Sequence, residues 1–416
     1  MRLTVVLRRQ HMKRFWNDLW ERKGKFPATP PQIPKVLQEK GVTVIDPTEK
    51  APLPRWNPPV EDPRFYKPIP VEERPDYHEE QAYIAMPHTR LIEGVKQACI
   101  LTKSECRTGF PPSVHELIGQ VEIPNQDLLL QRYIMQAHVW DPTQEKLPKR
   151  IDTSKVGWKF NREYGIPRGR SATMLMKNML RLCQTLAGRY PSIANDFRLI
   201  YKPYLGTHYY YKDKLINIQG LSEWLLSSRN PLLPFADVDE VDGTAAKPLD
   251  TIYPIFPTID LLKEHCYSVQ NQTGFVKECS HSHPHTIFVS HHNYWTNDQR
   301  QAKCLLFAFG YAVANARKRF GDRIQTLPEP ISVQCVNMDE TSINFLFFQL
   351  NTLNFGSDDG VKNIAWVDSG NVLFEKHLPK PWLGPEHETL RLDNYDPKPF
   401  HKVLAVFVNG AEGVST

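Results

Sequence analysis

Five histidines and a cysteine fall within seventeen residues, in the stretch KECSHSHPHTIFVSHHN at 277–293. Imidazole and thiolate are preferred zinc ligands, so the pattern raises the possibility of a metal-dependent hydrolase that uses His281 and His283 with a distant carboxylate. Strand rise would place His281 and His285 about 13 Å apart, whereas zinc ligands lie about 2 Å from one ion. Pro284 interrupts the strand, and no acid follows at metal-ligand spacing. We therefore interpret the stretch as a polar strand edge with hydrogen-bonded or solvated imidazoles, and keep the hydrolase as the alternative.

Other catalytic signals are also missing from the sequence. It contains no GxxxxGK loop, no GxGxxG loop and no GxSxG elbow. The acidic DVDEVDG at 237–243 departs from a calcium loop, because Val241 occupies the third ligand position and Pro248 stands where the bidentate glutamate belongs. We predict no catalytic residue, no metal site and no cofactor, and therefore a protein that is not an enzyme.

One segment has the chemistry to bind RNA. Residues 146–181 hold ten basic and two acidic side chains, with Trp158, Phe160 and Tyr164 among them. Lysine and arginine neutralise phosphates, and aromatic faces stack on unpaired bases. The alternative is a solvated basic loop. The predicted RNA-binding residues are Lys149, Arg150, Lys155, Lys159, Arg162, Arg168 and Arg170.

The distribution of charge and the spacing of the cysteines indicate the cellular compartment. The first 25 residues hold eight basic side chains against two acids, and the rest of the 416-residue chain is nearly neutral. An arginine-rich, acid-poor opening predicts a mitochondrial presequence at 1–26, with a retained basic tail that binds RNA or a membrane surface as the alternative. Seven scattered cysteines without C-x-x-C spacing indicate reduced thiols. The longest near-apolar run, 304–316, is shorter than the roughly 20 residues of a membrane span.

Proline shapes the next part of the chain, since thirteen of the residues at 27–75 are proline. Proline lacks an amide donor and disfavours helix at the preceding residue, so ordinary helices and central strands are not expected. Aromatic and apolar side chains are interleaved, including Trp56, Phe65 and Tyr66. We predict an extended proline-rich arm over 27–80 that lies on a surface.

The segments that follow predict an α+β fold, in which a helical N-terminal half packs with a mixed β-sheet C-terminal half. Residues 81–235 are expected to be mainly helical and to carry the basic segment. Helices are predicted at 88–105, at 125–141 with Asn125 as N-cap, and at 171–188, and short strands at 197–202 and 214–219 around an aromatic turn at 204–211.

The region 250–416 is predicted to be α/β. It should contain a strand at 283–291, a buried helix at 297–321, strands at 331–336 and 343–351, and a hairpin at 364–375 that turns at Ser369 and Gly370. Phe345 to Phe348 are apolar on both faces, which predicts a central strand. The stretch at 400–410 should close the core.

Several blocks resemble a known family. These are DPRFYKPIP (62–70), RLIEGVKQACILTK (90–103), NQTGF (271–275), HPHTIFV (283–289), LLFAFGYAVANAR (305–317), FLFFQLNT (345–352) and GVKNIAWVDS (360–369). In this order they are similar to the thirty-seventh family of animal mitochondrial large-subunit ribosomal proteins, which shares ancestry with a mitoribosomal protein of the programmed cell death protein nine type. The resemblance runs from about residue 55 to the C-terminus.

The resemblance implies a non-enzymatic constituent of the large subunit of the mitochondrial ribosome, located in the matrix. It implies contacts with mitochondrial large-subunit rRNA and neighbouring ribosomal proteins, including the paralogous subunit, and no catalytic residues. The stretch 155–170 is longer and more basic than the family pattern, so the RNA-binding prediction rests on its chemistry alone. A transient assembly factor of the same ribosome would need the same basic patch and arm, and stays an alternative.

Overall fold

The computed structural model describes residues 33–41, 69–74, 77–139, 144–147, 164–266, 271–275, 279–291, 294–378 and 391–413. The predicted presequence and most of the predicted proline-rich arm lie outside these residues. Within the arm, the structure describes the short helix α2 (Lys35–Glu39), the 3-10 turn η1 (Val71–Glu73) and the start of strand β1 (Tyr77–Ala85). The chain divides into two units, Met1–Ile69 and Pro70–Thr416, and the fold described below is that of the second.

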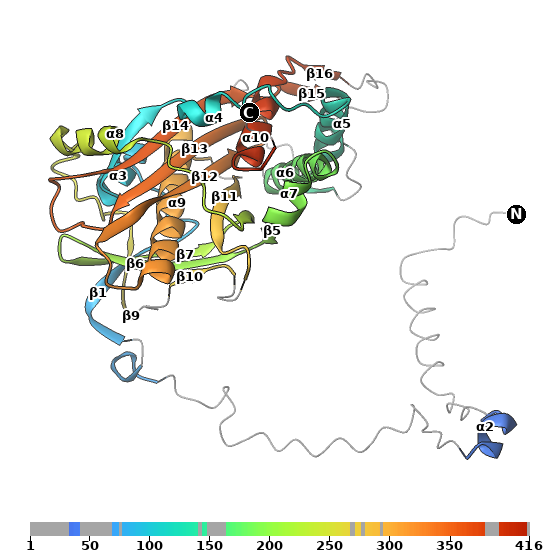
Figure 1. Ribbon diagram of the computed structural model, residues 1–416, viewed down its shortest axis with the longest axis horizontal. Coiled ribbons are helices and arrows are strands. Elements are labelled where there is room, and N and C mark those ends of the chain that lie inside the picture. The colour runs from blue at the N-terminus through green and yellow to red at the C-terminus, as the bar shows by residue number, and fades with distance from the viewer. Residues whose placement is uncertain are drawn as a thin grey trace, which may run out of the picture. The chain divides into compact units, whose positions relative to one another are not determined.

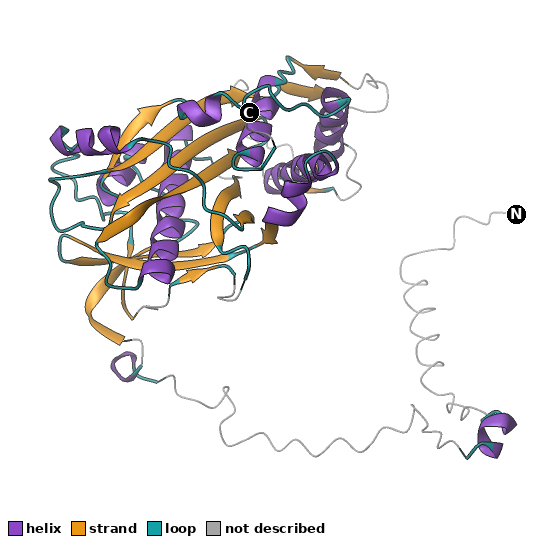
Figure 2. Ribbon diagram, viewed as in Figure 1, coloured by secondary structure: helices purple, strands orange, loops and turns teal. Residues whose placement is uncertain are grey.

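Two sheets and two groups of helices form four layers in this unit (Figures 1 and 2). The order of the seven-stranded sheet is β2 (Ser104–Thr108), β14 (Asn363–Val372), β13 (Ser342–Thr352), β12 (Thr326–Met338), β11 (His283–Ser290), β8 (Trp224–Ser228) and β5 (Phe197–Tyr201). The order of the five-stranded sheet is β10 (Gln272–Thr273), β6 (Tyr204–Tyr211), β7 (Lys214–Leu221), β1 and β9 (Leu262–Cys266). The α+β class is therefore confirmed.

Helix α9 (Asn297–Phe320) lies between the two sheets (Figure 1). It starts with a capping box, in which Thr296 Oγ1 accepts from the Gln299 amide at 3.3 Å and the Gln299 side chain accepts from the Thr296 amide. It ends at Gly321, whose φ is +99°. Strands β11 and β12 run parallel, so α9 is the crossover of a β-α-β unit and must cover the sheet that they share. The predicted helix at 297–321 is confirmed.

The second helix of this layer, α3 (Gly94–Leu101), is shorter than the predicted helix at 88–105. Lys103 adopts a left-handed φ of +49°, which ends the helical path. The chain then enters β2, where Ser104 to Thr108 pair in parallel with Asn363 to Val367. Long-range pairing with β14 therefore overrides the local helical pattern.

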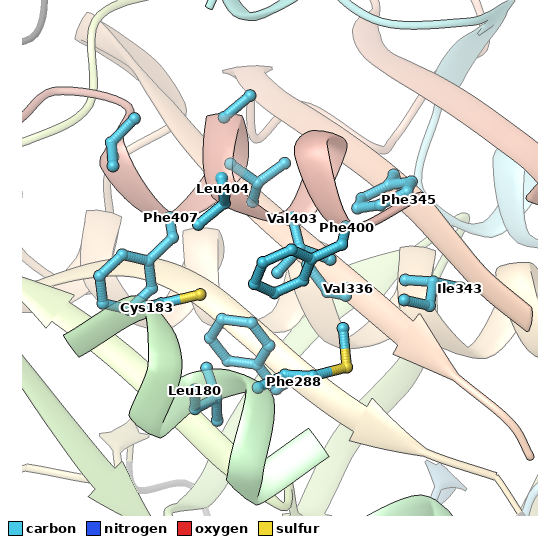
Figure 3. Packing of buried hydrophobic residues seen from close by; sticks show 14 of the residues in the cluster. Leu180, Cys183, Phe288, Val336, Ile343, Phe345, Phe400, Val403, Leu404 and Phe407 are labelled. Atoms are coloured by element: carbon cyan, nitrogen blue, oxygen red, sulfur yellow. The ribbon is translucent and has the colours of Figure 1, made fainter. Parts of the chain in front are cut away.

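The outer face of the seven-stranded sheet is covered by α5 (Gln126–His138), α6 (Arg168–Gln184) and α10 (Lys398–Val408). Figure 3 shows Leu180 and Cys183 of α6 and Phe400 of α10 close to Phe288 and Val336 of the sheet. The helices predicted at 125–141 and 171–188 are confirmed, with shifted ends. Asn125 is the N-cap residue of α5, as predicted, but its backbone is left-handed with φ of +56° and its side chain makes no capping hydrogen bond.

Strand β13 is buried on both faces, as predicted for a central strand. Phe345 and Phe347 pack into the cluster beneath α6 and α10, whereas Leu346 and Phe348 pack into the cluster around α9. The alternation of a strand sends successive side chains to opposite faces. A continuous apolar run is therefore required where both faces of the sheet are covered.

Two segments predicted to turn are strands instead. The aromatic stretch 204–211 is β6, and its two-residue turn lies later, at Lys212 and Asp213, which both have positive φ. The predicted hairpin at 364–375 is wrong, because β14 continues through Ser369 and Gly370. Gly370, with φ of +85°, forms a bulge against β13, where its amide donates to Asn344 Oδ1 at 2.9 Å.

The remaining elements are short. Residues 81–235, predicted to be mainly helical, also supply strands to both sheets. None of the described helices is long and apolar enough to cross a membrane. The short elements are α4 (Pro112–His115), η2 (Thr185–Gly188), α7 (Pro191–Asp196), α8 (Val238–Gly243), η3 (Thr244–Ala246), and the two-stranded pairs β3 (Glu145–Lys146) with β4 (Tyr164–Gly165) and β15 (Lys376–Leu378) with β16 (Arg391–Asp393).

Candidate nucleic-acid interface

Two short strands flank the connection that holds five of the seven predicted RNA-binding residues. Strands β3 and β4 pair antiparallel, with Glu145 opposite Gly165 and Lys146 opposite Tyr164. The Lys146 ammonium lies 6.0 Å from the centroid of the Tyr164 ring. Lys149, Arg150, Lys155, Lys159 and Arg162 belong to the connection between these strands and lie outside the described residues.

The two remaining candidates, Arg168 and Arg170, lie in the first turn of α6. The Arg168 guanidinium lies 5.0 Å from the centroid of the Tyr294 ring, and its Nε is 3.3 Å from Glu340 Oε1. Burial raises the pKa of Glu340, and the charge of Arg168 opposes that rise. The first turn of α6 contains no acid. The positive end of the helix dipole and the arginine charges therefore lie together here, and the Glu340 carboxylate already pairs with Arg168.

Arg168 is held by groups from a different part of the chain. Glu340 belongs to the β12–β13 connection, and Tyr294 precedes α9. The buried face of α6 anchors this helix end, with Leu175, Met176 and Met179 in the cluster over the seven-stranded sheet. The end of the basic segment is thus placed on a rigid element, while Arg168 itself stays exposed.

The histidine stretch has a structural explanation. His281 Nε2 donates to the Asn195 carbonyl oxygen at 2.8 Å, and its Nδ1 accepts from the Ser280 hydroxyl at 2.8 Å. His285 is bonded in the same way, with Nε2 donating to the Asn409 carbonyl oxygen and Nδ1 accepting from the Thr286 hydroxyl, both at 2.7 Å. A carbonyl only accepts, so both rings are fixed as the Nε2-protonated tautomer. Neither ring retains a nitrogen lone pair for a metal.

His285 is also fully buried, and burial lowers its pKa to about 4. The pKa of His283 is lowered as well, first by burial and then by the charge of Arg319. Within the described ranges, no three His, Cys, Asp or Glu residues are grouped to hold a metal ion. The predicted hydrogen bonds are confirmed for His281 and His285, but the predicted strand edge is wrong, because β11 lies between β8 and β12.

A second surface was not found from the sequence. The loop 251–262, between η3 and β9, exposes large apolar side chains, with Tyr253 88% and Phe256 70% exposed. Ile259 and Leu262 continue this exposure, and the Lys214 ammonium lies 4.9 Å from the centroid of the Phe256 ring. The available signal was aromatic and apolar residues alternating with proline in TIYPIFPTID. Such a group of exposed apolar side chains is typical of contact with another macromolecule.

Curated proteins align with most of the chain, whereas no protein-family model matches it. A protein of Rattus norvegicus named Large ribosomal subunit protein mL37 is 34% identical over 368 residues, which cover 86% of this chain and 82% of the rat protein. The protein of the same name from Bos taurus is 33% identical over 368 residues, with the same coverage. That from Gallus gallus is 32% identical over 349 residues, covering 82% of this chain and 76% of the chicken protein.

Proposed function

The chain belongs to the mL37 family of mitochondrial large-subunit ribosomal proteins, and on that premise we propose that it is a non-enzymatic structural constituent of this subunit. The observation that carries the proposal is the length of the shared sequence, which extends over 86% of the chain. A shared fold alone does not imply function. Similarity over nearly the whole of both proteins is a stronger argument than a shared motif.

The hydrogen bonds of the histidines argue against the alternative of a metal-dependent hydrolase. Such an enzyme would need His281 and His283 to present ring nitrogens to one ion. Both nitrogens of His281 are engaged, one with a backbone carbonyl and one with the hydroxyl of Ser280. The histidine stretch therefore supports a structural role, in which His281 bonds to Asn195 of α7 and His285 of β11 bonds to Asn409, the residue that follows α10.

We further propose that the basic segment binds mitochondrial large-subunit rRNA. The residues are Lys149, Arg150, Lys155, Lys159, Arg162, Arg168 and Arg170. Their charge supports phosphate contacts, and the two strands that flank the connection between β3 and β4 pair with each other. The exposed arginine at the start of α6 adds to this positive surface.

Neighbouring ribosomal proteins are the second class of partner that we propose. The exposed apolar loop 251–262 supports a protein neighbour rather than RNA, because its exposed residues carry few positive charges and several large apolar groups. The paralogous subunit of the programmed cell death protein nine type is the candidate neighbour. The test is cross-linking of intact subunits at Tyr253, and cross-links to rRNA alone would contradict this assignment.

The decisive experiment is sedimentation of a detergent lysate of mitochondria on a sucrose gradient, with this chain followed beside large-subunit rRNA. We expect stoichiometric co-migration with free large subunits and whole ribosomes that survives moderate salt. Occupancy well below one copy per mature subunit would instead favour the assembly factor. A chain found only at the top of the gradient would overturn the ribosomal proposal.

The contribution of the basic segment is testable by charge removal. Replacing Lys155, Lys159, Arg162, Arg168 and Arg170 with glutamine should weaken incorporation into the subunit in competition with wild type and leave solubility intact, since phosphate contacts are lost. The matched control removes five exposed positive charges elsewhere, at Lys96, Lys263, Arg323, Lys376 and Lys398. Equal incorporation of both variants would contradict RNA binding by the segment.

A further inference from the structure

An open groove lies where the C-terminal end of α9 meets the connection between β5 and β6. Its volume is about 870 Å³, and its walls come from residues 200–204, residues 271–275 and the last turn of α9. We refer to it as the aromatic-basic groove, after six of its lining residues: Tyr201, Lys202, Tyr204, Phe275, Arg317 and Lys318. None of these residues belongs to the basic segment or to the apolar loop.

The walls of the groove are held by the fold itself. The Lys202 amide donates to the Glu223 carbonyl oxygen at 3.0 Å, and the Thr207 hydroxyl donates to Asn271 Oδ1 at 3.1 Å. Gly274, with φ of +78°, comes so close to Pro203 that an added Cβ would lie 2.4 Å from the proline Cβ. Glycine is required at this position, because a side chain would clash with Pro203. The groove therefore has a defined shape before any partner binds.

Two of the aromatic residues that line this groove are exposed. Tyr201 is 55% exposed and Tyr204 is 40% exposed. The Tyr201 ring is supported from behind by Trp224, with centroids 4.7 Å apart. A rigid, half-exposed ring is a platform on which a planar ligand can stack at little cost in conformational entropy.

Positive charges are interleaved with these rings. The Lys202 ammonium lies 5.3 Å from the centroid of the Tyr201 ring, and the Lys318 ammonium lies 4.5 Å from that of Phe275. Arg317 donates through Nη1 to the His208 carbonyl oxygen, which fixes its guanidinium at the groove. The acid that lines the groove, Asp322, accepts from Asn271 Nδ2 at 2.8 Å. Three cations against one hydrogen-bonded carboxylate give the groove a positive field.

We propose that the aromatic-basic groove binds unpaired nucleotides of single-stranded RNA. Stacking platforms with cations beside them are the arrangement that recognises unstacked bases and the adjoining phosphates. Pockets of about 300–1,000 Å³ hold ligands of drug size, so the groove is large enough for one or two nucleotides. That the RNA is ribosomal rests on the proposed function; the binding chemistry does not.

The test uses the purified full-length chain and a fluorescein-labelled single-stranded oligouridine of twelve nucleotides, with binding followed by fluorescence anisotropy. Tyr201→Ala and Tyr204→Ala should each weaken binding about 5- to 100-fold, because a base loses its platform. Lys202→Gln and Lys318→Gln should each reduce the slope of log affinity against log salt by about 0.7. Each of these four substitutions is made both in the otherwise wild-type chain and in the five-glutamine variant of the basic segment.

Tyr210→Ala is the matched control. Tyr210 is 49% exposed on the same strand and the same face as Tyr204, about 20 Å away by strand rise, and does not line the groove. This variant should bind as wild type. Equal affinity of the Tyr201, Tyr204 and Tyr210 variants would overturn the proposal, and so would equal competition by a duplex of the same length.

Ultraviolet cross-linking of the wild-type chain to the oligouridine provides a test without mutation. Nucleotide adducts should appear by mass spectrometry on peptides that contain Tyr201, Tyr204 or Phe275, and adducts confined to other peptides would overturn the proposal. The two proposals fail separately. A chain that sediments with the subunit while its groove variants bind RNA normally refutes only the groove. A groove that binds RNA in a chain absent from the subunit refutes only the ribosomal function.

Discussion

At the scale of single residues, hydrogen-bond geometry decides between a ligand and a structural histidine. The residue types at His281, His283 and His285 suit a metal site, but strand spacing opposes one, and backbone carbonyls from distant segments accept hydrogen bonds from Nε2 of His281 and His285. Those carbonyls belong to Asn195 and Asn409. Contacts at such separations in the sequence have no local signal, so the sequence could show the imidazoles but not their partners.

Burial of His285 makes stability depend on pH. Its pKa is about 4 in the folded chain, while a histidine in an unfolded chain titrates near 6.5, so the unfolded state binds more protons between these values. The contribution of His285 to the free energy of unfolding is complete above about pH 6.5 and is lost as pH falls towards 4. Between pH 7 and pH 5 this loss amounts to about 2 kcal/mol. Urea unfolding should show this loss in wild type and a correspondingly smaller loss in His285→Gln.

The exposed His115 of α4 supplies the control, since His115→Gln should keep the wild-type difference between the two pH values. The variant His285→Gln should also be less stable at pH 7, because it disrupts the bond to the Asn409 carbonyl. An unchanged pH dependence in His285→Gln would show that His285 is not the group that titrates.

At the scale of elements, the sequence predicted what local periodicity controls. Helix α9 has an apolar pattern and a terminating Gly321, so its limits were found almost to the residue. Prediction from the sequence failed where pairing with a distant strand overrides the local pattern. Gly370 carries a turn signal, yet β14 stays paired with β13 on both sides of this position and the glycine forms a bulge. The aromatic-basic groove was missed for the same reason, since its walls meet only through the sheet.

Gly310 tests how tightly α9 packs against the five-stranded sheet. An added Cβ would lie 2.9 Å from Leu205 Cδ2 and 3.2 Å from Ile218 Cγ2, and both side chains are fully buried. Gly310→Val should therefore lower the free energy of unfolding by about 1–3 kcal/mol through overpacking. The control is Gly188→Val, where no atom lies within 4 Å of the added Cβ and a change within about 0.5 kcal/mol is expected. Equal stability of both variants would refute close packing at Gly310.

At the scale of the whole folded unit, the two sheets share one internal layer. Phe309 of α9 contacts Tyr209 of β6 with ring centroids 4.9 Å apart and Phe348 of β13 at 5.9 Å. The hydroxyl of Tyr209 donates to the Leu101 carbonyl oxygen of α3 at 2.9 Å, so the second helix of the layer joins the same cluster. One buried helix thus couples the five-stranded sheet to the seven-stranded sheet beneath α6.

Phe309→Ala should destabilise both sheets together, by about 3–5 kcal/mol, because it removes a fully buried ring that contacts both. Hydrogen exchange should accelerate in β6 and β13 to the same extent, with one cooperative unfolding transition. Phe256→Ala, in the exposed apolar loop, is the control and should change neither. Faster exchange in β6 alone would show that the sheets unfold independently.

The pairing of β2 with β14 also sets an order of events during synthesis. Strand β2 ends at Thr108, and its parallel partner begins at Asn363, far along the chain. At about 5–20 residues per second, this edge of the sheet stays open for on the order of tens of seconds after β2 has been made. A folding intermediate with an unpaired strand is prone to aggregation for as long as it lasts. The exposure of β2 therefore ends only when Asn363 to Val367 have been made and can pair with it.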